Sequence, residues 1–291
     1  MILIVGATGL VGSATLRQLT ARGVPVRALV RSPEKAATLA GPGVETIVGD
    51  LEQPASLDAA LDGVTRALLI SPLHPRQVEW QGNFVEAARR AGAVHIVKLS
   101  GLGTAPDSPL RSGQWHAQTE RHIAEAGLPF TCLHPPFFMQ NLLRSASAIA
   151  EQGVLVAAMQ VGKVAMVDAR DVAAVAVAAL TADGHVGKSY TITGPEALSF
   201  QEVAHKLAAA TGRPVTYQDV PLATVRQELV AAGLPAWLVE VRMEFATALR
   251  DGYAAAVTDT VQAVTGRPAR TFDAFAREHA AVFRSDCRKP F

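Results

Sequence analysis

The sequence has few cysteines, few charges and no long apolar run, and each absence excludes a class of protein. Its two cysteines, Cys132 and Cys287, are too few for a disulfide framework and lack metal-ligand spacing. Only 18% of the 291 residues are charged and the net charge is +1, which gives no overall field to attract nucleic acid or an anionic membrane. We therefore expect neither partner, and a reducing cytoplasm is the simplest location.

Membrane insertion is excluded by length. The longest small apolar stretch, Val172–Leu180, falls well short of the roughly 20 residues that a spanning helix needs. The opening Met1–Val5 is too short for a signal segment. Because 49% of the residues are hydrophobic, we expect a large buried core and little disorder.

The first half of the chain alternates apolar runs with helical patterns, which predicts parallel strands joined by crossover helices. The apolar runs show little polar alternation, as expected for strands whose two faces are both covered. The fold class is therefore α/β, a Rossmann-type doubly wound parallel sheet. The expected strands are Ile2–Val5, Pro25–Val30, Val44–Val48, Arg66–Ile70, Val94–Leu99 and Phe130–His134. The expected helices are Leu10–Arg22, Pro33–Ala40, Pro54–Leu61, Arg76–Ala91 and Gln114–Ala126.

The regular alternation fades after Pro135 and Pro136. We expect residues 1–150 to form a dinucleotide-binding domain, with residues 164–193 packing back onto it. Residues 151–291 should form mainly a smaller, mostly helical substrate-binding lobe, interwoven with the first domain. Further elements are expected as helices over Asn141–Glu151, residues 168–181 and Ser199–Thr211, and as strands over Val164–Val167 and Ser189–Thr193. Ser199 and Glu202 have the spacing of a capping box. The apolar C-terminal helices could pair two subunits into a homodimer, and the sequence leaves this open.

A glycine-rich loop follows the first strand and opens a helix, which is the context of a phosphate-binding loop. Gly6 permits the tight turn, Gly9 lets a pyrophosphate approach the backbone, and Gly12 lets the helix pack close to the sheet. The helix N-terminus offers free N–H groups and partial positive charge to the phosphates. The loop predicts a nicotinamide dinucleotide, with contacts from Gly6, Thr8, Gly9, Leu10, Val11 and Gly12.

The end of the second strand indicates which dinucleotide binds. NAD sites usually carry a carboxylate there for the ribose 2′-hydroxyl. This strand instead ends in Arg31, which could pair with a 2′-phosphate, so NADP(H) is favoured over NAD(H); otherwise Arg31 is a solvated surface charge.

Later strand ends supply further cofactor candidates. Asp50 and Leu51 follow the third strand, where Asp50 could bind the adenine amino group or stabilise a turn. Ser71 and Pro72 follow the fourth strand near the expected nicotinamide ribose, and Pro135 leaves the sixth strand beside the expected nicotinamide.

With these residues in hand, the chain resembles the NmrA-like branch of the atypical short-chain dehydrogenase/reductase superfamily. It is similar to quinone-oxidoreductase type 2 and isoflavone-reductase-like proteins. The resemblance implies a Rossmann domain that binds NAD(P)H and a small lobe that closes a substrate cleft. It covers about the first 200 residues. The matching segments are GATGLVG at Gly6–Gly12, Gly49-Asp50-Leu51, VKLSG at Val97–Gly101, ERHIAEAGLPFT at Glu120–Thr131 and HPPFFMQN at His134–Asn141.

The sequence lacks the Tyr-x-x-x-Lys pair of ordinary short-chain dehydrogenases, because all three tyrosines lie beyond residue 185. Aligned on the resemblance, His116 falls where isoflavone-reductase-like enzymes place a catalytic lysine, and Ser100 falls where the superfamily places a hydroxyl facing the substrate. Spaced at i, i+4, His116 and Glu120 could form a hydrogen bond that raises the pKa of the histidine. His116 could then protonate a carbonyl oxygen as hydride arrives; its alternative role is to solvate a helix end.

An apolar substrate pocket is expected from Trp115, Phe137, Phe138 and Met139, with Trp237 and Met243 able to cap it; core packing is the alternative for each. The histidines are scattered without ligand spacing, so no metal is expected. The function predicted is an NADPH-dependent reductase that transfers a hydride to a quinone, enone or aromatic carbonyl compound. A non-catalytic NADP(H)-binding redox sensor is the alternative, and a sugar-nucleotide epimerase is a third hypothesis.

Overall fold

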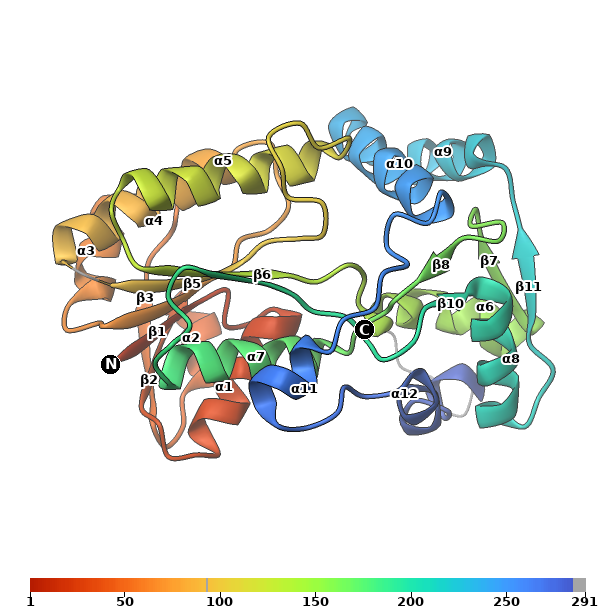
Figure 1. Cartoon of the computed structure of the whole chain (residues 1–291), viewed down its shortest axis with the longest axis horizontal. Coiled ribbons are helices and arrows are strands. Elements are labelled where there is room, and N and C mark those ends of the chain that lie inside the picture. The colour runs from red at the N-terminus through yellow and green to blue at the C-terminus, as the bar shows by residue number, and fades with distance from the viewer. Residues whose placement is uncertain (93, 285–291) are drawn as a thin grey trace. The chain divides into compact units, whose positions relative to one another are not determined.

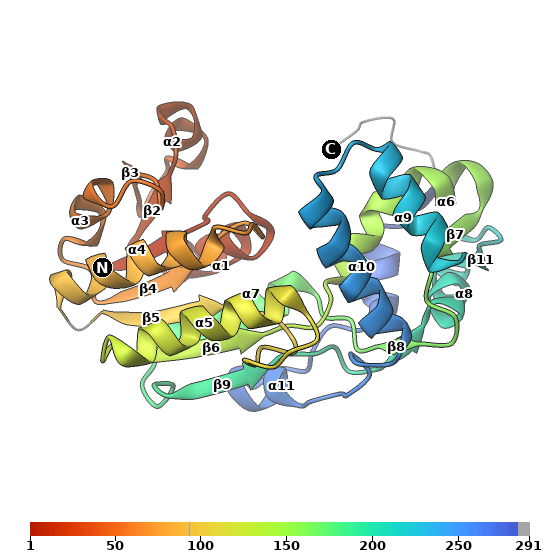
Figure 2. The same cartoon turned by 90° about the horizontal axis from the view of Figure 1, so that it is seen from above.

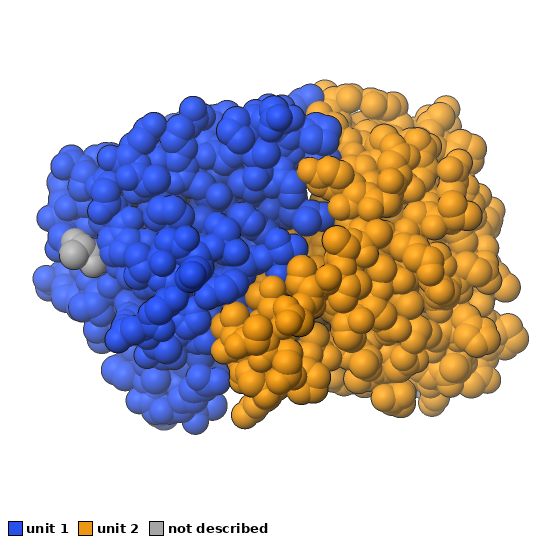
Figure 3. Space-filling view, in the orientation of Figure 1, with its two compact units in different colours: residues 1–134, 169–191 blue, residues 135–168, 192–291 orange. Residues whose placement is uncertain are grey.

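The computed structural model describes residues 1–92 and 94–284, so Cys287 lies outside the described residues. The described chain divides into two compact units, coloured separately in Figure 3. Unit 1 comprises residues 1–134 and 169–191, and unit 2 comprises residues 135–168 and 192–291. The chain therefore leaves unit 1 after its sixth strand, returns for one helix and one strand, and leaves again.

Unit 1 is built on a sheet of seven parallel strands in the order β3-β2-β1-β4-β5-β6-β9. The strand order reverses between β1 and β4, which confirms the doubly wound Rossmann-type prediction. Strands β4, β5, β6 and β9 lie side by side in Figure 2. The elements of unit 1 are β1 (Ile2–Val5), α1 (Leu10–Thr20), β2 (Val26–Val30), α2 (Pro33–Leu39), β3 (Val44–Val48), α3 (Ala55–Leu61), β4 (Arg66–Leu69), α4 (Gln77–Ala91), β5 (His95–Leu99), α5 (Arg111–Glu125), β6 (Phe130–His134), α7 (Ala169–Thr181) and β9 (Lys188–Thr191).

Helices cover both faces of this sheet. In Figure 1, α3, α4 and α5 run along one face, while α1 and α7 pack against each other on the other face. This double coverage explains why the central strands are continuous apolar runs, since neither face meets water. The six strands predicted before Pro135 match within one residue. The strand predicted over Ser189–Thr193 is β9 and ends two residues earlier, and the one predicted over Val164–Val167 ends at Val164. Helix α5 begins at Arg111, three residues before the predicted start.

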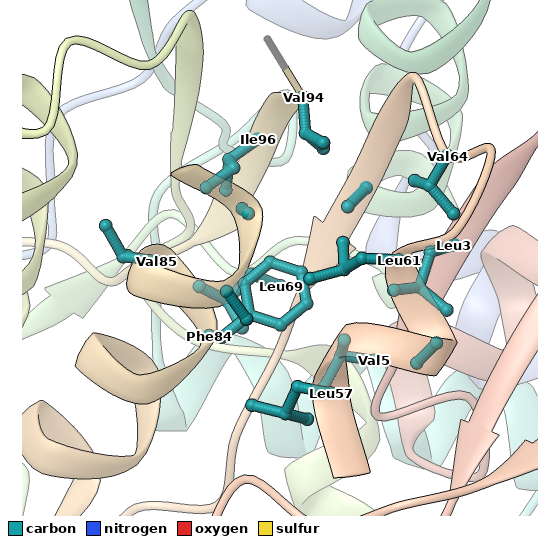
Figure 4. Packing of buried hydrophobic residues seen from close by; sticks show 14 of the residues in the cluster. Leu3, Val5, Leu57, Leu61, Val64, Leu69, Phe84, Val85, Val94 and Ile96 are labelled. Atoms are coloured by element: carbon teal, nitrogen blue, oxygen red, sulfur yellow. The ribbon is translucent and has the colours of Figure 1, made fainter. Parts of the chain in front are cut away.

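The core beneath α3 and α4 forms from residues of both layers (Figure 4). Phe84 of α4 is fully buried among Leu57 and Leu61 of α3 and Leu69 of β4. Burying a side chain of this size contributes about 1.5–3 kcal/mol. This packing fixes the helices on the sheet and so fixes the loops at the strand ends.

Unit 2 is mostly helical, with two small two-stranded sheets. Strand β7 pairs in parallel with β11, and β10 pairs antiparallel with β8. Its elements are η1 (Met139–Ser145), α6 (Ala146–Gln152), β7 (Val154–Ala157), β8 (Lys163–Val164), β10 (Leu198–Ser199), α8 (Phe200–Thr211), β11 (Thr216–Asp219), α9 (Leu222–Ala231), α10 (Ala236–Arg250), α11 (Thr260–Thr265), α12 (Phe272–Glu278) and η2 (Val282–Arg284).

Sequence prediction was less accurate in unit 2. The capping box at Ser199 and Glu202 is confirmed. The helix expected over Asn141–Glu151 is wrong in form, because a 3-10 helix precedes α6. The pair of β7 and β11 was missed, since Thr216–Asp219 is polar and gains its strand form from pairing with a distant segment. Homodimer formation stays a prediction.

Candidate functional site

The glycine loop between β1 and α1 has three glycines with three different constraints. Gly6 has φ of +81°, a conformation that L side chains rarely adopt. A Cβ on Gly12 would lie 2.1 Å from the Gly6 carbonyl oxygen, so only glycine allows this turn to close on the helix. A Cβ on Gly9 would meet only the Gly6 carbonyl oxygen, at 3.3 Å, among the described atoms within 4 Å. Gly6 and Gly12 therefore allow the turn to form. Gly9 leaves open the outer part of the loop, Thr8 to Leu10, which we call its crest.

The crest of this loop suits a phosphate. Thr8, Gly9 and Leu10 are exposed, and Leu10 retains 46% of its accessible surface. Gly9 is the N-cap residue of α1 and supplies no side-chain cap, and the first turn contains no acidic residue. The N-terminal N–H groups and the positive end of the helix dipole are thus available to an anion. These residues fit the pyrophosphate of a dinucleotide.

The other predicted cofactor residues follow successive strands at the same edge of the sheet, because parallel strands end together. Arg31 is exposed after β2. Asp50, after β3, accepts a hydrogen bond from the Glu52 backbone N–H at 3.0 Å, which is the turn role foreseen as its alternative. Leu51 is buried.

Ser71, after β4, is held by the side chain of Gln81, whose Nε2 donates to Ser71 Oγ at 2.6 Å. Pro72 beside it is exposed. The cofactor roles of these residues stay predictions, but Gly6, Arg31, Asp50 and Ser71 share one edge of unit 1.

A buried lysine organises the polar groups at the ends of β5 and β6. Lys98 of β5 has no exposed surface, and its Nζ donates at 2.8 Å to Ser100 Oγ and at 2.9 Å to His116 Nδ1. A third, longer contact of 3.4 Å reaches the Leu99 carbonyl oxygen. An ammonium group has three donors and no acceptor, so Lys98 is fully satisfied without water.

Glu120 of α5 carries the compensating negative charge. Ser100 Oγ donates a short hydrogen bond to Glu120 Oε1, and His134 Nε2 lies 2.8 Å from the same oxygen. A chain of hydrogen bonds therefore runs from His116 through Lys98, Ser100 and Glu120 to His134. Lys98 and Ser100 lie at the end of β5 and just after it, and every other link joins α5 to the ends of β5 and β6.

The expected pairing of His116 with Glu120 is wrong. His116 instead takes Lys98 as its partner, and Glu120 takes Ser100 and His134. The predicted rise in the pKa of His116 is wrong as well. Burial, with the positive charge of Lys98 added, holds the pKa of this imidazole well below its ordinary value. His116 is therefore neutral at physiological pH.

Burial also changes the protonation of its neighbours. It lowers the pKa of Lys98 to about 8, with Glu120 opposing the shift. Burial raises the pKa of Glu120, but hydrogen bonds from His134 and Ser100 and the charge of Lys98 outweigh it and hold the pKa below its ordinary value. At neutral pH the network thus contains one ammonium and one carboxylate.

Three potential metal ligands lie close together here, although their spacing in the sequence did not indicate a metal site. Ligand atoms of Glu120, Cys132 and His134 all lie within 4.8 Å of one another. Cys132 is buried, and burial followed by the charge of Glu120 raises the pKa of its thiol, which opposes the thiolate that a metal needs. The ammonium of Lys98, in register with Cys132, adds repulsion toward a dication. We assign no metal to these residues.

The predicted pocket residues fall into both units. Trp115 is partly buried on α5 of unit 1. In unit 2, the Val167 backbone fixes the segment after the buried Pro135: Val167 N donates to the Phe137 carbonyl and the Val167 carbonyl accepts from Met139 N, both at 2.9 Å. Phe137 stacks on Phe245 of α10 with ring centroids 6.5 Å apart.

The apolar candidates of unit 2 differ in exposure. Met139 is 1% exposed and Met243 is 7% exposed, so both pack in the interior of unit 2. Phe137, Phe138 and Trp237 are partly buried and keep surface for a ligand. Their role as pocket walls stays a prediction.

Comparison with known proteins agrees with this geometry. A model of the NmrA-like family matches residues 1–272. The chain belongs to the NmrA-like family. The resemblance inferred from the sequence is thereby confirmed, and it extends well beyond the first 200 residues.

Individual relatives cover almost the whole of this NmrA-like chain. An NAD(P)H azoreductase of Xenophilus azovorans is 46% identical over 97% of this chain and 99% of its own. The crystal structure of an NADPH-dependent quinone oxidoreductase of Escherichia coli, complexed with NADPH, aligns with a TM-score of 0.87 at 32% identity, over 96% of this chain and 99% of that one. The triphenylmethane reductase of Citrobacter sp., complexed with NADP(H), aligns with a TM-score of 0.86 at 31% identity, over 96% and 100%. Among residues 1–92 and 94–284, no helix combines the length and apolar character that crossing a membrane requires.

Sequence reasoning missed Lys98 and His134 as members of the site. A signal for Lys98 was present, since a lysine inside the apolar strand His95–Leu99 must be buried when helices cover both sheet faces. Buried lysines are rare unless paired, which marks the position as special. His134 gave no comparable signal, because a polar residue at a strand end is ordinary.

Proposed function

We propose that this NmrA-like protein is an NADPH-dependent oxidoreductase that reduces planar conjugated acceptors such as quinones and azo or related dyes. The observation that carries the proposal is the open glycine crest at the edge of the sheet that also holds the Lys98, His116, Ser100 and Glu120 network. A hydride-transfer site needs this combination of a dinucleotide cradle and a proton donor.

Unit 1 binds the cofactor in this proposal. The N-terminus of α1 holds the pyrophosphate, and Arg31 after β2 pairs with the 2′-phosphate. NADPH supplies the hydride. Asp50 stabilises its own turn, so the adenosine is held mainly by the backbone and by Arg31.

The chain's own groups then handle the proton. His116 is neutral, and its Nδ1 accepts a hydrogen bond from Lys98, so the ring proton resides on Nε2. His116 Nε2–H donates to the acceptor's oxygen or nitrogen as negative charge develops there. Ser100 Oγ accepts from Lys98 and donates to Glu120, so it orients the network and does not donate a proton to the acceptor.

Unit 2 contributes the substrate lobe. The exposed surface of Phe137 and Phe138 provides flat apolar walls that suit an aromatic ring. The names of the relatives, an azoreductase, a quinone oxidoreductase and a triphenylmethane reductase, share this substrate chemistry. A cytoplasmic location belongs to the same proposal, since Cys132 is a free thiol.

The test is oxidation of NADPH, followed by the near-ultraviolet absorbance of the reduced nicotinamide, with a panel of quinones, azo dyes and enones. Parallel fluorescence titration measures NADPH binding. Turnover with any acceptor is the expected result. The matched control is Gly9→Val, which fills the phosphate crest and should abolish both binding and turnover. Tight NADPH binding with no turnover across the panel would refute the reductase and point to a redox sensor.

A further inference from the structure

Lys98 is a charged side chain in a place where charge is costly. It has no exposed surface and lies in the middle of the sheet, with Leu69 of β4 and Cys132 of β6 in register on either side. Transferring an ammonium group from water to such a site is costly unless partners compensate it. A lysine kept at this position therefore has a specific task or a very good partner set.

The partners of Lys98 are unequal. Ser100 passes the interaction on to Glu120, which balances the charge of Lys98. His116 adds no charge to the balance, because its pKa is depressed and the ring is neutral. The 2.9 Å contact with His116 Nδ1 therefore orients the histidine and does not balance the charge of the lysine.

This contact has a defined direction. An ammonium group can only donate, so His116 Nδ1 must accept, and the proton of the neutral ring must be on Nε2. Within the described residues Nε2 makes no hydrogen bond of its own, and its neighbour is Gly101, where a Cβ would stand 3.8 Å away. Because residue 101 is a glycine, it places no side chain next to Nε2.

We infer that Lys98 is the positioning residue of this site: it holds His116 in the Nε2–H tautomer and resupplies the proton that His116 gives to the reduced acceptor. This inference rests on the proposed reductase function. For a carbonyl acceptor, a C–H bond forms with the hydride of the nicotinamide cofactor, and the acceptor oxygen forms an O–H bond with the His116 Nε2 proton. His116 Nδ1 gains a proton from Lys98 Nζ as Nε2 loses one, so the ring stays neutral. Lys98 is left as an amine. The site resets when His116 Nε2 takes up a proton from water and Nδ1 returns its proton to Lys98 Nζ, which restores the ammonium and the Nε2–H tautomer.

The charge environment allows this cycle. The titratable groups facing Lys98 are His116 and Glu120 from α5 and Cys132 and His134 from β6, and helix α7 covers the opposite face of the sheet. Glu120 favours the ammonium, whereas burial favours the amine and lowers the pKa of Lys98 to about 8. A group that can exist in both forms near neutral pH is suited to giving up and regaining a proton.

The first test needs neither cofactor nor substrate. Nitrogen-15 NMR of the imidazole rings reports the tautomer of each of the eight histidines, and His116→Gln identifies the His116 signals by their loss. We expect a neutral ring with its proton on Nε2 at about pH 6.5. A proton on Nδ1, or a charged ring, overturns the inference.

Substitution separates Lys98 from a merely structural residue. In Lys98→Met we expect the preference for Nε2–H to be lost, while Lys163→Met, a half-exposed lysine in unit 2 paired with Glu202, leaves it unchanged. Turnover of weakly electrophilic acceptors should fall at least about tenfold in Lys98→Met with the KM for NADPH unchanged, since general acid catalysis contributes roughly 10²–10⁴-fold. A quinone, which is already electrophilic, should be affected much less. An unchanged tautomer in a folded Lys98→Met, or an equal loss with every acceptor, overturns the inference.

The unmodified protein gives a further test if Lys98→Met does not fold. As pH rises through the Lys98 pKa of about 8, the amine can accept a hydrogen bond, so the tautomer preference of His116 should relax with that midpoint. No change across that range refutes the role of Lys98. Failure of the reductase function shows itself differently, as an unmodified protein with the expected His116 tautomer but no NADPH turnover.

Discussion

Two glycines of the phosphate loop, Gly12 and Gly9, should respond differently to one added methyl group. A Cβ on Gly12 would lie 2.1 Å from the oxygen and 2.8 Å from the carbon of the Gly6 carbonyl, both backbone atoms that cannot rotate away. Overpacking of this kind costs about 1–3 kcal/mol or more, against about 1 kcal/mol that alanine gains over glycine in a helix. We expect Gly12→Ala to lower the free energy of unfolding by about 2 kcal/mol, or Tm by roughly 5 °C.

Gly9→Ala should keep the fold and lose the ligand. Its Cβ would meet only the Gly6 oxygen at 3.3 Å among the described atoms, and its backbone already has φ of −79° and ψ of 173°, which alanine adopts freely. Stability should change by less than about 0.5 kcal/mol. The methyl group would occupy the crest proposed for the pyrophosphate, so the Kd for NADPH should rise at least tenfold, or about 1.4 kcal/mol.

Thermal unfolding and NADPH fluorescence titration measure the two effects separately. Gly41→Ala is the matched control, because a Cβ at this exposed glycine of unit 1 would meet nothing within 4 Å. It should leave both Tm and Kd unchanged. Gly9→Ala that binds NADPH like the unmodified protein would refute the location of the pyrophosphate. Gly12→Ala with unaltered Tm would refute the steric argument for the turn.

Three further predictions follow from the same geometry. Arg31→Asp should shift the ratio of NADPH to NADH affinity toward NADH by at least tenfold, since a charge-assisted hydrogen bond contributes about 1.5–3 kcal/mol; Arg22→Asp is the charge-matched surface control, and an equal shift in both would remove Arg31 from the site. His116→Ala should lower turnover of enones while NADPH affinity stays intact, and unchanged turnover would exclude the histidine from the chemistry. Burial and the nearby Arg66 lower the pKa of His95 to about 4, so its stabilising neutral form is fully present above pH 6.5. Stability measured by urea unfolding should then fall between about pH 6.5 and 4 by up to about 3 kcal/mol, and His95→Gln, which can keep the hydrogen bond to Thr131, should flatten that slope.

The amino-acid sequence by itself determined the fold of unit 1 and the place of the cofactor loop. Continuous apolar strands such as Ile2–Val5, the glycine spacing from Gly6 to Gly12, and the basic residue at the end of the second strand are local features. Such local features can be predicted from the sequence because strand burial, turn conformation and helix starts depend on neighbouring residues. The same locality let the capping box of α8 be recognised.

Only the tertiary structure decided the partners within the proton-handling network. Local spacing favoured a pair between His116 and Glu120, one turn apart on α5. In the structure His116 instead pairs with Lys98 of β5, and Glu120 pairs with His134 of β6. Lys98 on β5 and His134 on β6 are 36 residues apart in the chain, and α5 brings His116 and Glu120 over both. An exposed i, i+4 pair contributes only about 0.2–0.5 kcal/mol, whereas leaving the charge of Lys98 buried and unpaired costs several. The cost of leaving the buried charge of Lys98 unpaired therefore determines which groups pair. The position of that charge is set by packing between segments that are distant in the sequence.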